Sequence, residues 1–177
     1  PRFRARRGRS LGAWAEKIGQ TLAESADAHR IADVAVGCFL SGGVDSSLVT
    51  RETARSQPNV QCFSVGYAEG SYSELPAARA AARALGVPLT ETTVTAAEFF
   101  AANRAVQWYL DEPMPNPAEV PLYFLCETAR QRVKVVLSGE GADELFGGYP
   151  LYRQAVWAER WQAFSISVSR AGSLSSS

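Results

Sequence analysis

The chain has 177 residues, of which 46% are hydrophobic, and this is enough to build the core of one α/β domain. Its net charge of +0 does not favour nucleic acid or an anionic membrane as a partner. No apolar run approaches the ~20 residues that span a bilayer. The 3 cysteines and 1 histidine fit neither a zinc site nor a disulfide framework. The cysteines are typical of thiols in a reducing cytoplasm.

The two ends of the chain differ from its middle. Residues 1–10 are rich in arginine and are expected to form a basic linker or arm. Residues 164–177 are rich in serine and are expected to be disordered. Pro1 is not an initiator methionine, so we expect a piece of a longer protein. Residues 11–163 remain as the predicted folded domain.

Between the ends, helical and strand patterns alternate. Leu11, Trp14, Ile18 and Leu22 mark one face of a first helix. The further predicted elements, in chain order, are strand 34–40, helix 46–55, strand 60–65, helix 73–85, strand 89–94, helix 96–108, a proline-rich loop 111–117, helix 119–130, strand 133–137 and a helix around 151–161. Strands separated by helices of this length predict a mainly parallel, twisted sheet with helices on both faces.

The first glycine loop is Ser41-Gly42-Gly43-Val44-Asp45-Ser46-Ser47, between a predicted strand and a predicted helix. Adjacent glycines allow a tight turn close to a ligand, and the hydroxyls and the first amides of the helix suit phosphate. Because a carboxylate beside phosphate needs a cation between them, Asp45 indicates Mg²⁺. No Gly-Lys pair is present, which excludes a Walker A loop. The loop is predicted to bind a magnesium nucleotide.

A second glycine loop, residues 137–149, follows the last predicted strand and again begins with Ser-Gly before acidic residues. In an open parallel sheet, ligands bind beyond the carboxyl ends of the strands, where the strand order reverses. If the first strand is central, with the second and third on one side and the fourth on the other, both loops leave neighbouring strands at this point. Asp45 and Asp143 would then face one another and share Mg²⁺. A helix cap followed by a plain loop is the alternative.

These residues resemble the synthetase domain of the glutamine-hydrolysing asparagine synthetases, in the ATP pyrophosphatase (PP-loop) superfamily. The resemblance covers about residues 22–153. Its anchors are the segments 39–47 (FLSGGVDSS), 62–66 (CFSVG), 111–113 (DEP) and 135–149 (VVLSGEGADELFGGY). It implies an adenine nucleotide alpha hydrolase-like (HUP/PP-loop) fold, with residues 11–163 as an ATP-binding synthetase domain that is cut short at its C-terminal side.

The resemblance also implies roles for single residues. The adenine would contact Leu40 and Val65, and Ser138 and Gly139 would hold the nucleoside and α-phosphate side. Mg²⁺ would lie on Asp45 and Asp143, and Glu140 would act catalytically on the acyl-adenylate. The β- and γ-phosphates would lie on the first glycine loop, at Ser41, Gly42, Gly43, Asp45 and Ser46.

The implied reaction makes asparagine. The aspartate side chain attacks the α-phosphorus of ATP, pyrophosphate leaves, and ammonia then displaces AMP from β-aspartyl-AMP. An N-terminal glutaminase domain would supply the ammonia in the full-length, cytoplasmic protein, for which a homodimer is also expected. That domain is absent here, so the 177 residues alone are expected to have little or no activity.

Two departures from the family, and several functions that share its motifs, leave alternatives open. The phosphate-contacting lysine of the family has no counterpart, because Lys17 and Lys134 lie outside the motifs; Arg153 is a candidate substitute. Asn116 stands where relatives usually have aspartate, which leaves the substrate contacts of that loop open. β-Lactam synthetases and lasso-peptide cyclases, which use the same adenylation, fit these motifs as well, and so does a non-catalytic nucleotide-binding fragment.

Overall fold

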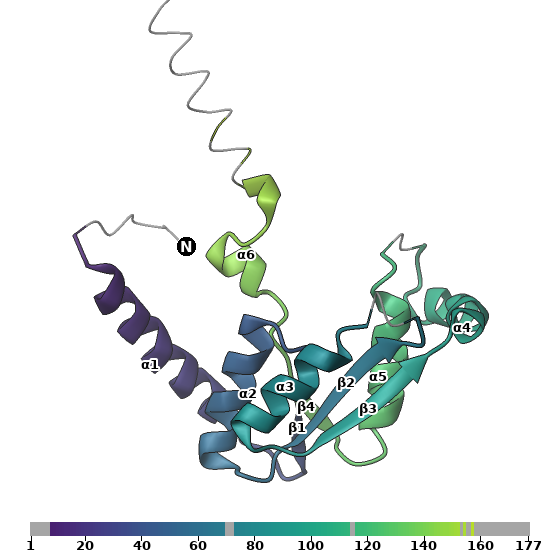
Figure 1. Cartoon of the computed structure of the whole chain (residues 1–177), viewed down its shortest axis with the longest axis horizontal. Helices are drawn as coiled ribbons and strands as arrows, with labels where there is room; N and C mark the ends of the chain where they lie inside the picture. Colours follow the sequence, from purple (N-terminus) through teal and green to yellow (C-terminus); the bar gives the residue numbers. More distant parts are fainter. Residues whose placement is uncertain (1–7, 70–72, 114–115, 153, 155–156, 158–177) are drawn as a thin grey trace, which may run out of the picture. The chain divides into compact units, whose positions relative to one another are not determined.

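The structure, a computed structural model, describes residues 8–69, 73–113, 116–152, 154 and 157. The chain divides into two units, Pro1–Gly139 and Glu140–Ser177. The first unit holds a four-stranded parallel sheet in the order β3-β2-β1-β4 (Figure 1). β1 is therefore flanked by β2 and β4, and the predicted strand order is confirmed.

The four strands are short and lie close to their predicted places. Their bounds are β1 Val36–Phe39, β2 Gln61–Tyr67, β3 Leu89–Val94 and β4 Val135–Leu137. β1 and β2 begin two and one residues later than predicted, and β2 runs two residues further. The prediction for β3 is confirmed to the residue.

The helices of the first unit also follow the predicted order. Their bounds are α1 Leu11–His29, α2 Val44–Ser56, α3 Leu75–Leu85, α4 Ala96–Tyr109 and α5 Glu119–Ala129. Side chains cap two of them: Ser10 accepts from the amide of Ala13 at the start of α1, and Thr95 forms a capping box with Glu98 at the start of α4. Within the described residues, no helix has both the length and the apolar character required to cross a membrane.

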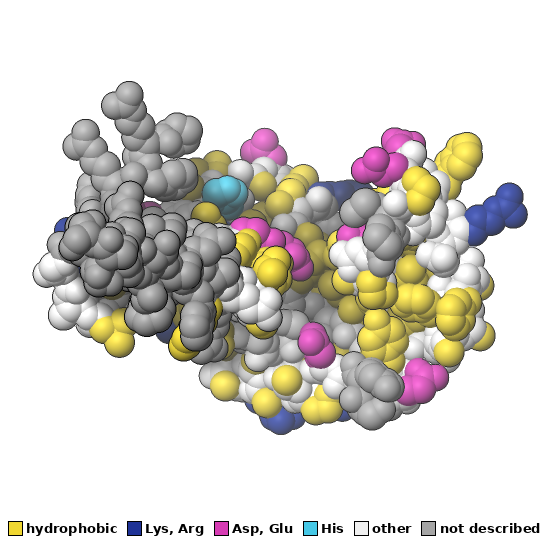
Figure 2. Space-filling view, turned by 90° about the horizontal axis from the view of Figure 1, so that it is seen from above, with side chains coloured by type: hydrophobic (Ala, Val, Ile, Leu, Met, Phe, Trp, Pro, Cys, Tyr) yellow, Lys and Arg dark blue, Asp and Glu magenta, His cyan; other side chains and the backbone are white. Residues whose placement is uncertain are grey.

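Helices cover both faces of the sheet, because alternate residues of a strand point to opposite faces. Cys38 of β1 and Cys62 of β2 pack with α2 and α3 in one buried cluster. The next residue of β2, Phe63, packs with α5 in a second cluster on the other face. α4 contacts α5, and hydrophobic side chains gather over these two helices at the right of Figure 2.

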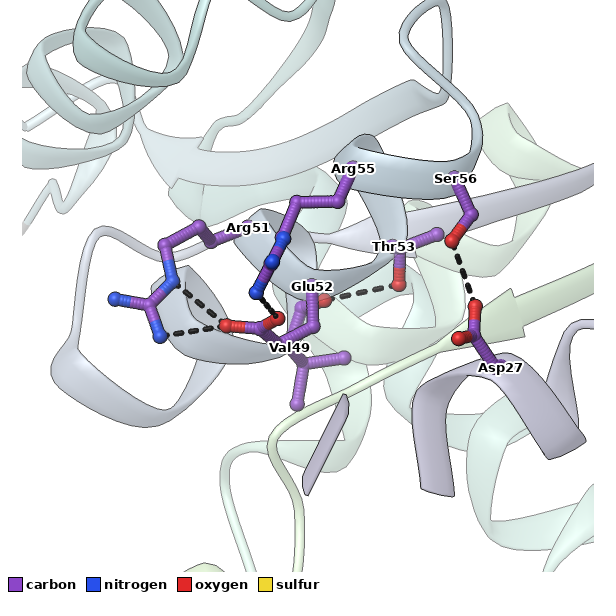
Figure 3. A network of polar contacts seen from close by, with 7 residues as sticks. All are labelled: Asp27, Val49, Arg51, Glu52, Thr53, Arg55 and Ser56. Carbon is purple, nitrogen blue, oxygen red and sulfur yellow. Dashed lines mark hydrogen bonds and ion pairs between the residues drawn. The ribbon is translucent and has the colours of Figure 1, made fainter. Parts of the chain in front are cut away.

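Figure 3 shows a network of polar contacts on α2, one of which joins this helix to α1. The Ser56 hydroxyl donates to Asp27 of α1 at 2.7 Å. The side chain of Glu52 is only 2% exposed, and it accepts from Arg51 at 2.5 and 2.8 Å and from Arg55 at 3.0 Å. Burial alone would raise the pKa of Glu52, but the two arginines outweigh it and the pKa is lowered. These ion pairs keep a buried carboxylate charged.

The second unit contains one short helix that was not predicted, α6 Ala142–Phe146. Glycines in the left-handed region stand at both of its ends, Gly141 with φ 86° and Gly147 with φ 68°. Residues 150–152, 154 and 157 are also helical. The rest of the helix predicted around 151–161 lies outside the described residues, and so do residues 1–7 of the predicted arm and the predicted disordered tail.

Candidate functional site

The first glycine loop joins β1 to α2 at the carboxyl end of the central strand. Gly42 has φ 86°, a value that suits glycine, and a Cβ built there would lie 2.7 Å from both the Ala77 oxygen and the Ala78 nitrogen of α3. Gly43 is the N-cap of α2 and has no side chain to bond the first amides of the helix. The backbone is therefore held against α3, and the first turn of α2 is left for another acceptor.

The hydroxyls of this loop bond to one another. Ser41 Oγ and Ser46 Oγ are 2.9 Å apart, and the Ser41 amide donates to Ser46 Oγ at 3.3 Å. The Gly43 amide in turn donates to Ser41 Oγ at 3.3 Å, and the Ser46 hydroxyl donates to the Gly43 oxygen at the same distance. These contacts hold two hydroxyls and several backbone groups around one turn. A phosphate could take over some of these bonds with little change of backbone.

The second glycine loop meets the first one at Gly139. β4 lies beside β1, with Leu137 opposite Cys38, so the chain leaves both strands at the same edge of the sheet. A Cβ at Gly139 would lie 2.7 Å from the Ser46 amide nitrogen and 3.0 Å from Asp45 Cβ. Gly139 is thus packed directly on the start of α2. The structure thus packs the start of the second motif on the first.

The adenine residues lie next to these loops in the sheet. Leu40 is 1% exposed and its amide donates to the Phe63 oxygen at 2.9 Å, so only its carbonyl could face a ligand. Val65 is half-buried near the end of β2. Gly66 follows it, and a Cβ there would overlap Ser73 and lie 2.6 Å from Leu75 Cγ. Sequence reasoning did not single out Gly66, although it ends the quoted segment 62–66.

The acidic residues divide between the two units. Asp45 lies exposed in the first turn of α2, where the helix dipole favours a carboxylate. Its exposed oxygens fit Mg²⁺, which is often held by one or two carboxylates together with the phosphates of a substrate. Glu140 and Asp143 belong to the second unit; Glu140 is exposed, and Asp143 lies in α6, where its side chain contacts Gly148. The shared metal of Asp45 and Asp143, and the role of Glu140, remain predictions.

In the proline-rich loop, the structure describes residues 111–113 and 116–117. The Asn116 side chain accepts from the Ala118 amide at 3.1 Å and donates to Glu119 at 3.2 Å, just before α5. Asp111, directly after α4, has φ 62°, a conformation that aspartate tolerates better than most residues. These contacts place the Asn116 side chain in a local turn just before α5. A cavity of about 420 Å³ on α4, lined by Ala101, Arg104, Ala105, Trp108 and Tyr109, includes no residue of the glycine loops.

A parallel sheet in this order, with glycine loops at the ends of β1 and β4, defines a protein of the PP-loop (HUP) fold. Among solved structures, the chain resembles the glutamine-dependent NAD⁺ synthetase of Acinetobacter baumannii, determined with ADP. The TM-score is 0.53 at 19% identity, over 84% of this chain and 30% of that one. At this identity the likeness concerns the fold.

The chain belongs to the asparagine synthase family, whose model matches residues 17–176. It is 48% identical over 139 residues to a putative glutamine-hydrolysing asparagine synthetase of Mycobacterium tuberculosis, covering 78% of this chain and 21% of that protein. It is 39% identical over 139 residues to asparagine synthetase 1 of Bacillus subtilis, covering 78% and 22%. The chain thus spans about a fifth of the length of these relatives.

Proposed function

We propose that the chain is the ATP-binding part of an amide-forming ligase that makes asparagine from aspartate. The observation that carries this proposal is the packing of Gly139 on Asp45 and Ser46, which joins two polar glycine loops at one edge of the sheet. Family membership supports it, since relatives are named glutamine-hydrolysing asparagine synthetases. A neighbour of like fold was determined with ADP, and nucleotide binding by this chain is consistent with that likeness.

The side chains of the loops would position and neutralise ATP. The hydroxyls of Ser41 and Ser46 and the Gly43 amide would bind the β- and γ-phosphates, while Ser138 and Gly139 would hold the α-phosphate side. Mg²⁺, held by Asp45 and Asp143, would neutralise phosphate charge and favour departure of pyrophosphate. Most of the catalytic effect would then come from alignment and charge stabilisation, because phosphoryl oxygens carry the developing charge.

The bond changes run in two steps. An aspartate β-carboxylate oxygen attacks the α-phosphorus, the bond to the bridging oxygen of pyrophosphate breaks, and β-aspartyl-AMP forms. Ammonia then attacks the acyl carbon, AMP leaves, and one proton is lost as the amide forms. Glu140 would accept this proton or hydrogen-bond the ammonia. A glutamine-hydrolysing domain of the longer protein would release the ammonia, as the names of the relatives suggest.

The first test measures the affinity of the chain for Mg-ATP by isothermal titration. Asp45→Asn should weaken binding by about tenfold or more, because a charge-assisted contact is worth about 1.5–3 kcal/mol. Asp33→Asn is the matched control, since Asp33 is also an exposed aspartate but precedes β1, at the opposite end of the strand. Equal affinity of Asp45→Asn and Asp33→Asn would place Asp45 outside the nucleotide site.

The second test identifies the product. A protein of the length of the relatives, supplied with aspartate, ATP and ammonia, should form asparagine, AMP and pyrophosphate in equal amounts. Formation of another amide by ring closure would assign the chain to the cyclases of this superfamily. Binding of Mg-ATP without any AMP formation in the long protein would favour a non-catalytic nucleotide-binding role.

A further inference from the structure

Two cysteines lie opposite one another in the centre of the sheet. β1 pairs with β2 so that Cys38 is the register partner of Cys62, and both residues are 0% exposed. Register partners on parallel strands point to the same face, and both residues belong to the cluster between the sheet and helices α2 and α3. Neither residue takes part in the proposed reaction. The chain thus buries two thiols side by side, one strand apart.

Their spacing suits a bridging ion better than a disulfide. Neighbouring strands are about 4.8 Å apart, and the Cβ atoms of partners that point the same way are separated by about as much. A disulfide requires Cβ atoms about 3.8 Å apart, so its formation would have to draw the strands together. Two metal–sulfur bonds of about 2.3 Å each, placed in line, span about 4.6 Å between the sulfurs. The spacing of paired strands therefore matches a linear two-coordinate ion between the two sulfurs.

The surroundings of the two thiols are partly polar. Cys62 Sγ donates to the Val60 oxygen at 3.7 Å. Thr50 and Thr53 of α2 are 0% and 1% exposed. The hydroxyls of both side chains face the Cys38 thiol and lower its pKa, against the larger effect of burial. The Thr50 Oγ1 is buried and makes no hydrogen bond of ordinary length to any described residue. This buried oxygen beside the Cys38 thiol can offer a weak additional contact to an ion.

We propose that Cys38 and Cys62 form a two-coordinate site for a soft divalent cation, of which the mercuric ion is the representative. On binding, two S–H bonds break, two metal–sulfur bonds form and two protons leave to solvent, with no change of oxidation state. The charges of the divalent ion and the two thiolates cancel, so no net charge is buried. A monovalent soft ion between the same thiolates would leave a buried negative charge.

Zinc does not match this site. Zinc sites in proteins are almost always four-coordinate, and three protein ligands is the usual minimum. In the part of the chain that the structure describes, no group of three or more His, Cys, Asp or Glu side chains is placed to hold a metal ion. The Cys38 and Cys62 pair therefore selects an ion that is satisfied by two sulfurs in line.

The test uses mercuric chloride and the full 177-residue chain carrying Cys126→Ala, which removes the exposed third thiol and leaves only the pair. Native mass spectrometry should show one mercury per chain with the loss of two hydrogens, and a thiol assay should lose two thiols for each metal. Removal of the metal by 2-mercaptoethanol should be at least about 100-fold slower than from a single thiol, because the second sulfur binds intramolecularly.

Two matched variants in the same background complete the test. Cys38→Ala and Cys62→Ala each keep one thiol, and their mercury should be lost rapidly to 2-mercaptoethanol. Circular dichroism must show the fold of the parent, and serine variants replace any alanine variant that is unfolded. Two mercury ions per chain, or equally rapid loss from the pair and from the single thiols, would overturn the proposal. So would an internal disulfide formed by diamide without loss of the fold, because it would contradict the spacing.

Discussion

Gly42→Ala tests whether the first glycine loop is held by its packing on α3. The substitution has two costs. An L-residue in the left-handed region costs about 1–2 kcal/mol. The new methyl group would also lie 2.7 Å from the Ala77 oxygen and the Ala78 nitrogen, which are backbone atoms and cannot turn away. Overpacking of this kind costs typically about 1–3 kcal/mol. The sum, about 2–5 kcal/mol, is a large share of the stability of an ordinary domain.

Gly86→Ala is the matched control. Gly86 ends α3 with φ 68°, and a Cβ there would meet nothing within 4 Å. Both variants lose the same conformational freedom in the unfolded chain, so the difference between them isolates the contact with α3. Urea unfolding followed by tryptophan fluorescence should give a free energy of unfolding about 1–3 kcal/mol lower for Gly42→Ala than for Gly86→Ala, at equal m-values. Equal stability of the two variants would refute the packing of Gly42 on α3.

Four further predictions concern the acids and the buried thiol. In the long protein, Glu140→Gln should lower the rate of asparagine formation by roughly 100-fold or more with ATP binding nearly unchanged; normal turnover with a lower Tm would instead make Glu140 a helix cap. Asp143→Asn should weaken Mg-ATP binding in a titration, with little change in the urea midpoint. Because the pKa of Glu52 lies below its ordinary value of 4.5, its charge stabilises the fold at higher pH and this stabilisation is lost as the pH falls through the lowered pKa. Urea midpoints measured from pH 6 downwards should therefore fall less steeply in Glu52→Gln. Burial, and then the nearby Cys38, raise the pKa of Cys62 from 9.0 to about 12, so the unfolded chain loses this proton first and stability should decline from pH 9 upwards. Cys62→Ala should remove part of that decline in urea titrations at pH 8 to 10.5.

The order of elements could be predicted because each has a strong local signal. Apolar runs separated by helical periods predicted four strands. The hypothesis that the first strand is central placed β1 and β4 side by side, as they are in the structure. α6 could not be predicted, because its five residues lie between glycines and have no apolar period. The bounds of β1 and β2 shifted by one or two residues for a similar reason, since hydrogen bonding rather than hydrophobicity decides where a strand begins.

Contacts between distant parts of the chain were beyond the reach of the sequence. The motif predicts that Gly42 is needed for a tight turn, but not that its Cα faces Ala77. The motif likewise does not reveal that Glu52 is buried, because the arginines that stabilise its charge could equally lie in solvent. The sequence leaves the substrate contacts of Asn116 open, and its bonds to Ala118 and Glu119 could be described only with the start of α5 in place.

The packing shows which motif residues are required by the fold itself and which are better explained by a bound ligand. Gly42 and Gly139 fit against backbone atoms of α3 and α2, so the fold alone would require glycine at both positions. Asp45 differs, because its side chain is exposed and makes no hydrogen bond or ion pair with the described residues. The helix dipole accounts for only about 0.3–1 kcal/mol of preference for an acid there. A loss of nucleotide affinity in Asp45→Asn that exceeds its loss of stability would therefore assign this carboxylate to the ligand, whereas the same comparison at either glycine could not separate folding from binding.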